Sequence, residues 1–177
     1  MFSEVSRNPL VKDSCIHPGR YDELKSILNN IEQIQKNLNH FLDSKRQLFA
    51  RFYFLSDDEV LSIIGSSNPR HIQGYLQKMF DNISALNFIE SDSLLAQAMI
   101  SLEKERMDFL DPVECTGKVE NWMVHIEREM KASNRWITKE AIFYYRFQQT
   151  RLEWMRKYIG MVVLAVNQIW STWEIEE

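Results

Sequence analysis

A heptad pattern of apolar residues over residues 21–49 constrains the fold of this chain more than any other feature. The apolar residues form two rows with seven-residue spacing: Leu24, Ile31 and Leu38 in one, and Ile27, Ile34, Phe41 and Leu48 in the other. Together the rows make the a/d seam of an α-helix. At a rise of 1.5 Å per residue this helix would be roughly 40 Å long. We therefore expect a mainly α fold, an elongated helical bundle built on one long helix.

Composition agrees with a helical fold and excludes several classes of protein. Glycine (5 of 177 residues) and proline (4) are too scarce for a sheet-rich fold with many tight turns. The net charge is −4, and no basic stripe is evident, so we expect no nucleic-acid partner. The longest apolar run, Met161 to Val166, is too short to cross a bilayer, and the first residues lack a signal-peptide pattern. Cys15 and Cys115 lie far apart, which favours reduced, inert thiols in an intracellular protein.

Local signals divide the rest of the chain into elements. Residues 1–20 carry turn signals and are predicted to be irregular, and the predicted helices cover residues 21–49, 57–64, 69–87, 117–147 and 151–176. Ser56 and Glu59 form a capping-box pattern, and Gly65 is predicted to end that helix in a left-handed conformation. Residues 94–113 break the helical period and are predicted to form a β-hairpin with a solvated charged tip at 103–106.

A search for chemistry finds no catalytic, cofactor-binding or metal-binding residues. Gly117-Lys118 is the sole Gly-Lys pair, and it lacks the glycines of a phosphate-binding loop. Cys15 and His17 have metal-like spacing but no second pair of ligands. The acidic run Asp57-Asp58-Glu59 fits the first turn of a helix better than a metal site.

Aromatic residues are abundant and favour packing over a ligand cleft. The five tryptophans occur at helical spacing: Trp122, Trp136, Trp154, Trp170 and Trp173. The block Phe49, Phe52, Tyr53 and Phe54 is predicted to be a wedge between the long helix and the next one. At such spacing, aromatic side chains mostly fill helix–helix contacts.

Several stretches together resemble the linker region of dynein heavy chains, which lies N-terminal to the ATPase ring. They are Phe52 to Glu59, Asn68-Pro69, Leu76 to Ile83, Met99 to Val113, Gly117 to Met123 and Gln168-Ile169-Trp170. The resemblance covers nearly the whole chain, and the stretch Trp154 to Trp173 looks most like ciliary outer-arm chains. Residues 21–177 would then be part of a dynein linker domain.

The resemblance implies a mechanical role without a nucleotide site in this chain. A linker is a helical arm that bends as the AAA+ ring of the same heavy chain hydrolyses ATP, so a stiff lever with a hinge is needed. Phe49–Ser56 and Gly65–Pro69 are the candidate hinges. The implied partners are that ring, other dynein chains and, through domains outside this sequence, microtubules. The implied location is the cytoplasm and cytoskeleton, in the axoneme of a cilium.

Two other readings of the sequence stay open. The chain could be a stand-alone helical interaction module, related to dynein, that binds another helix through the Leu24–Leu48 seam. It could also be an enzyme with an unrecognised site, which the failed motif search makes the weakest alternative.

Overall fold

The computed structural model describes residues 6–7, 10, 12, 16, 18–89, 94–147 and 150–176. It divides into two compact units, Met1–Ser44 and Lys45–Glu177. Cys15, His17 and most of the predicted irregular segment 1–20 lie outside the described residues. None of the helices in the described ranges is long and apolar enough to span a bilayer.

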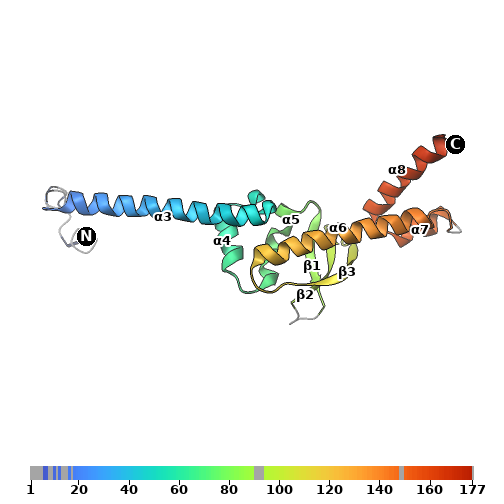
Figure 1. Cartoon of the computed structure of the whole chain (residues 1–177), viewed down its shortest axis with the longest axis horizontal. Coiled ribbons are helices and arrows are strands. Elements are labelled where there is room, and N and C mark those ends of the chain that lie inside the picture. The colour runs from blue at the N-terminus through green and yellow to red at the C-terminus, as the bar shows by residue number, and fades with distance from the viewer. Residues whose placement is uncertain are drawn as a thin grey trace. The chain divides into compact units, whose positions relative to one another are not determined.

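Helix α3, Arg20–Leu48, confirms the predicted long helix within one residue at each end (Figure 1). Its first turn carries Asp22 and Glu23 and its last turn Lys45 and Arg46, the charge order that the helix dipole favours. From residue 21 to residue 44 the side chains are exposed except for Leu42, and the heptad seam is among the exposed ones. The packing of this seam in a helical bundle therefore stays a prediction.

Four short helical elements follow α3. They are the 3₁₀-helix η1 (Ala50–Phe54), α4 (Asp57–Gly65), the 3₁₀-helix η2 (Pro69–Tyr75) and α5 (Leu76–Met79). The capping box at Ser56 and Glu59 is confirmed. The left-handed stop at Gly65 is wrong: Gly65 is the last residue of α4, and Ser66 ends the helix in an extended conformation. The described glycines with positive φ are Gly19 and Gly117.

An antiparallel sheet of three strands contains the predicted hairpin and one further strand. The strands are β1 (Ile83–Phe88), β2 (Leu95–Ser101) and β3 (Arg106–Glu114), in the order β1-β2-β3. Strands β2 and β3 are the expected hairpin, but β1 falls within the helix predicted over 69–87, which is wrong beyond Met79. A short apolar run such as Ile83–Leu86 fits either period, and pairing such as Leu86 with Met99 makes it a strand.

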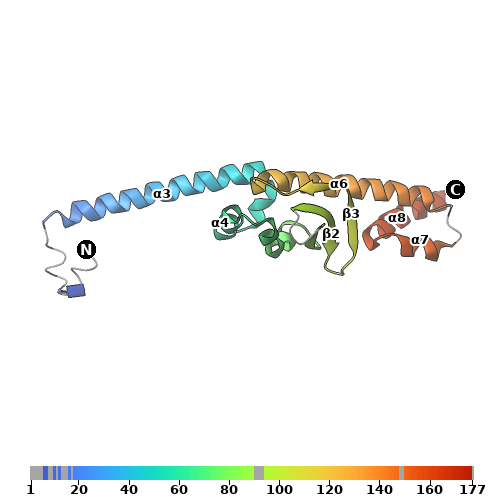
Figure 2. The ribbon, with the colours of Figure 1, turned by 90° about the horizontal axis from the view of Figure 1, so that it is seen from below.

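Helix α6, Val119–Tyr144, crosses one face of the sheet and continues past it to α7 and α8 (Figures 1 and 2). The helix predicted over 151–176 is two helices, α7 (Arg151–Lys157) and α8 (Gly160–Glu176). The break occurs because Tyr158 takes an extended conformation and buries its ring. Ala141 of α6 and Trp154, Tyr158, Val162, Val163 and Val166 then form one buried core.

Candidate functional site: the joint after the long helix

Residues 45–80 form a compact joint in which the last turn of α3 meets η1, α4 and α5. Phe49 and Phe52 are buried and pack edge to face, with ring centroids 5.0 Å apart. Phe80 lies 6.5 Å from Phe49 on the same apolar cluster. Tyr53 and Phe54 are exposed instead. The predicted aromatic wedge is therefore right for the two phenylalanines and wrong for its last two members.

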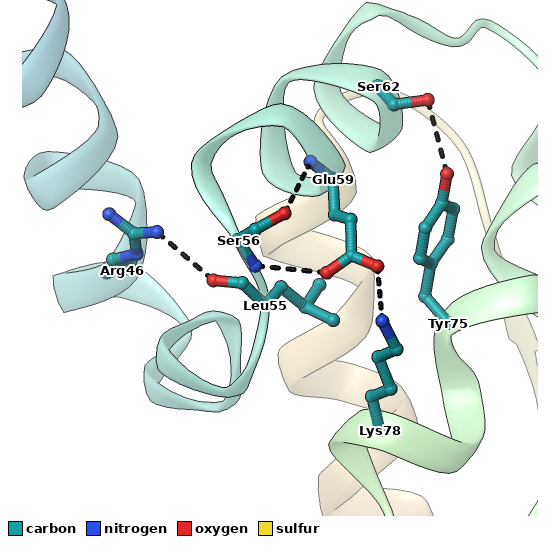
Figure 3. A network of polar contacts seen from close by, with 7 residues as sticks. All are labelled: Arg46, Leu55, Ser56, Glu59, Ser62, Tyr75 and Lys78. Atoms are coloured by element: carbon teal, nitrogen blue, oxygen red, sulfur yellow. Dashed lines mark hydrogen bonds and ion pairs between the residues drawn. The ribbon is translucent and has the colours of Figure 1, made fainter.

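Two arginines hold the turns of this joint together. Arg46 Nη2 donates to the Leu55 carbonyl at 3.2 Å (Figure 3). It also donates to Asp57 Oδ1 at 2.7 Å, so it connects the end of α3 to the first turn of α4. Arg51 Nη1 donates to the Met79 carbonyl at the end of α5, at 2.7 Å. Its guanidinium lies 4.5 Å from the Phe80 ring centroid and 3.4 Å from Glu127 of α6. Charged hydrogen bonds of this kind are stronger than neutral ones and fix geometry.

A buried ion pair ties α3 to α6. Lys45 Nζ lies 2.6 Å from Glu120 Oε1, although the residues are 75 positions apart. The Glu120 side chain is only 2% exposed and that of Lys45 14%. Removing such charges from water is costly, so each depends on its partner. The last turn of the long helix is thereby fixed to the first turn of α6.

Helix α4 is anchored from both sides by polar contacts. Glu59 N–H donates to Ser56 Oγ, and the Glu59 carboxylate accepts from Ser56 N–H at 3.0 Å and from Lys78 of α5 at 2.5 Å (Figure 3). Ser62 contacts His71 at 2.9 Å and accepts from the Tyr75 hydroxyl at 3.3 Å. These contacts connect α4 to η2 through Ser62 and to α5 through Glu59.

The network gives Glu59 a pH-dependent role. The hydrogen bond from Lys78, and then that from the Ser56 N–H, hold the pKa of Glu59 below its ordinary value of 4.5. A depressed pKa in the folded state adds stability above the unfolded value, and this stability is lost as pH falls through the folded value. We predict that Lys78→Gln raises the Glu59 titration midpoint toward 4.5 in a carboxyl NMR titration. An unchanged midpoint would show that Lys78 does not act on this carboxylate.

The second candidate hinge, Gly65–Pro69, forms one wall of a cavity of about 570 Å³. The opposite wall is the turn from Cys115 to Lys118, where Gly117 has φ +75°. Burial raises the pKa of the Cys115 thiol to about 11, which leaves it protonated and a poor nucleophile. Both turns, Gly65–Pro69 and Cys115–Lys118, therefore line one cavity, and its buried thiol is protonated.

A family model described as dynein heavy chain, N-terminal region 2, matches residues 1–141 of this chain. The chain belongs to the dynein heavy chain family. It is 47% identical to human dynein axonemal heavy chain 10 and 43% identical to the Chlamydomonas reinhardtii dynein-1-alpha heavy chain of the flagellar inner arm I1 complex, in both cases over its whole length. The ciliary dynein beta chain of Tripneustes gratilla is 34% identical over 99% of it. The chain spans 4% of the length of each of these relatives.

In this dynein segment the residues singled out by sequence do not converge on one chemical site. The tryptophans are distributed over α6, α7 and α8, with Trp122 and Trp154 buried and Trp136 exposed. Asp57 forms an ion pair with Arg46, and Glu59 forms one with Lys78. In the part of the chain that the structure describes, no three His, Cys, Asp or Glu side chains are grouped to hold a metal ion.

Sequence reasoning missed the charged residues that make the tertiary contacts of this dynein segment. Lys45, Arg51 and Glu120 gave no signal, because their partners are distant in sequence. Glu105 was taken for part of a solvated tip, yet its carboxylate accepts from the Gly160 N–H at 3.0 Å and so caps α8. The first turn of α8 carries no acidic residue of its own, so Glu105 supplies the negative charge at the N-terminus of this helix.

Proposed function

We propose that residues 21–177 are part of the linker of an axonemal dynein heavy chain and act as a non-catalytic lever segment. In this role they transmit the ATP-driven conformational change of the AAA+ ring in microtubule-based ciliary motility. The observation that carries the proposal is the joint: buried and charged contacts from Lys45, Arg46 and Arg51 fix the end of a 29-residue helix to the elements that follow it. A lever needs such a connection, because a loose one would absorb the movement.

The bending point in this proposal is Gly65–Pro69. Phe49–Ser56, the other candidate, is held by the Phe49–Phe52 contact and by Arg46. Gly65–Pro69 instead faces the cavity, and a Cβ added at Gly65 would meet nothing within 4 Å. The helices on either side are separately capped by Ser56 and Asn68. Rigid elements around a short extended stretch are the usual form of a hinge.

The partners follow from the lever role. They are the AAA+ ring of the same heavy chain, other dynein chains of the complex, and microtubules through other parts of the heavy chain. The names of the relatives place this chain in the cytoskeleton of the ciliary axoneme. Because the relative named for the flagellar inner arm I1 complex is 43% identical over the whole chain, the proposal takes an inner-arm chain in place of the expected outer-arm type.

The hinge is tested by stiffening it in the parent motor. Gly65→Ala favours the helical conformation, and Ser67→Pro suits the extended Ser66 before it. The double variant should slow microtubule gliding several-fold while ATP turnover without microtubules is retained, and Ser67→Ala is the matched control. Equal gliding velocities for the variant and the control would remove the hinge from the proposal.

A second candidate, a stand-alone helix-binding module, is favoured by the exposed seam of α3. The size of the native polypeptide separates the two functions. An immunoblot of isolated cilia against Phe52–Glu59 should give a band far above the 21.1 kDa of this sequence if the chain is part of a motor. A sole band near 21.1 kDa would support the module and end the lever proposal.

A further inference from the structure

The acidic and basic residues of α6 differ in their burial. Its four glutamates are buried or partly buried, and all four are engaged in contacts. Glu120 pairs with Lys45, and Glu127 with Arg51 and Lys131. Glu129 accepts from the Leu110 N–H at 3.0 Å and from Ser133 at 2.9 Å, and Glu140 accepts from Lys157 and Tyr158. The acidic side chains of α6 are therefore used inside the segment.

The exposed charges of α6 are all basic. They are Arg128, Lys131, Arg135 and Lys139. Lys131 pairs with Glu127, whereas Arg135 and Lys139 have no ion pair among the described residues and border a shallow hollow of about 520 Å³. No basic stripe was evident along the sequence, because the intervening glutamates balance these positive charges. Folding separates the two signs.

Two exposed aromatic side chains lie among these cations. Trp136 is 53% exposed and Phe143 is 62% exposed, and their seven-residue spacing places them on the same side of the helix. At about 1.5 Å per residue they are roughly 10 Å apart along the helix. Phe147, which contacts Phe143 at 5.1 Å between ring centroids, extends this apolar row at the end of α6. Trp, Phe and Arg are enriched at protein interfaces, and Trp and Arg are among the residues that contribute most of the binding energy.

Figure 2 shows the sheet, α7 and α8 of this unit on one side of α6. We propose that the opposite, basic and aromatic face of α6 is a docking surface for an acidic amphipathic helix of a protein partner. Apolar residues of that helix would cover Trp136 and Phe143, and its carboxylates would pair with Arg135 and Lys139. The proposal does not depend on the lever function, because it uses none of the joint residues.

The basic residues indicate a negatively charged partner. The row of exposed aromatic residues indicates that this partner is a protein. A phosphate backbone alone would use the cations and leave the exposed rings in water. A helix with apolar residues at i and i+7 matches the spacing of Trp136 and Phe143, and flanking carboxylates reach the cations beside them. The same recognition would include an acidic helix of another dynein chain.

The test is fluorescence anisotropy of the 177-residue chain with labelled synthetic peptides. The probe is a helical peptide of about 21 residues with leucines on one face and glutamates on the others. The comparison peptide has the same composition in scrambled order. We expect the amphipathic peptide to bind more tightly than the scrambled one, and to bind more weakly as salt is raised. Arg135→Glu/Lys139→Glu and Phe143→Ala should each weaken binding at least ten-fold.

Matched variants keep this test decisive. Lys25→Glu/Lys36→Glu makes the same charge change on exposed positions of α3 and should leave the affinity unchanged, and circular dichroism melting checks that each variant is folded. No binding of the amphipathic peptide, or equal weakening by both charge reversals, would overturn the proposal. Tighter binding of a single-stranded oligonucleotide or of anionic vesicles would replace the protein helix with that ligand.

Discussion

Replacing Lys45 with methionine is expected to destabilise the unit of residues 45–176 by about 3–5 kcal/mol, because it leaves the Glu120 carboxylate buried without its partner. The stem of methionine fills much of the space of the lysine stem, so lost packing adds little. The expected result is measured as the free energy of unfolding in urea, followed by circular dichroism. The same change should free the last turn of α3 from α6.

A double variant separates the cost of an unpaired charge from the value of the pair. In Lys45→Met/Glu120→Leu no charge stays buried, and most of the lost stability should return. Lys36→Met, at an exposed position of α3, is the matched control and should change the free energy of unfolding by less than about 0.5 kcal/mol. A loss below about 1 kcal/mol for Lys45→Met would mean that Glu120 reaches water or another donor.

Trp154→Ala is the second change with a large expected effect, a loss of about 3–5 kcal/mol. Trp154 is fully buried, its Nε1 donates to the Ala141 carbonyl at 3.0 Å, and its ring packs edge to face with Tyr145 at 5.0 Å. The truncation removes these contacts and leaves a cavity between α6, α7 and α8. Thermal unfolding should occur at a lower temperature, and hydrogen exchange should become faster mainly for the amides of α7 and α8.

Trp136→Ala is the natural control, because Trp136 is half exposed on α6 and should cost less than about 0.5 kcal/mol. Protection of α7 and α8 amides in Trp154→Ala equal to that of the parent chain would contradict the assignment of Trp154 as the centre of this core. A smaller loss in Trp154→Phe than in Trp154→Ala is expected, since a ring is kept while the donor to Ala141 is removed.

Local features of the fold were predictable because their causes lie within a few residues. The long helix follows from its apolar period, and the capping box follows from Ser56 and Glu59 being three positions apart. Asp57 and Glu59 occupy a first turn whose dipole attracts them. The β2–β3 hairpin was visible as a break in helical rhythm.

Features with distant partners were not predictable. Strand β1 has an apolar pattern that fits a helix as well, and its pairing with β2 overrides that preference. The sequence pattern around Glu105 predicts a solvated tip, but in the structure this residue bonds the first residue of α8. The pattern around Tyr158 predicts a helix, but its ring is buried in the core. In each case a contact across many residues outweighs a local preference worth less than about 1 kcal/mol.

The sequence by itself determined the helical class, the long α3, the capped start of α4 and the likeness to dynein heavy chains, because these depend on spacing and residue type along the chain. Only the tertiary structure decided which charges are buried and which face outward. Lys45 and Glu120 form a buried ion pair, and Arg135 and Lys139 form an exposed basic face, because folding brings some charges together and leaves others in water. Sequence order does not encode that distinction in any local pattern.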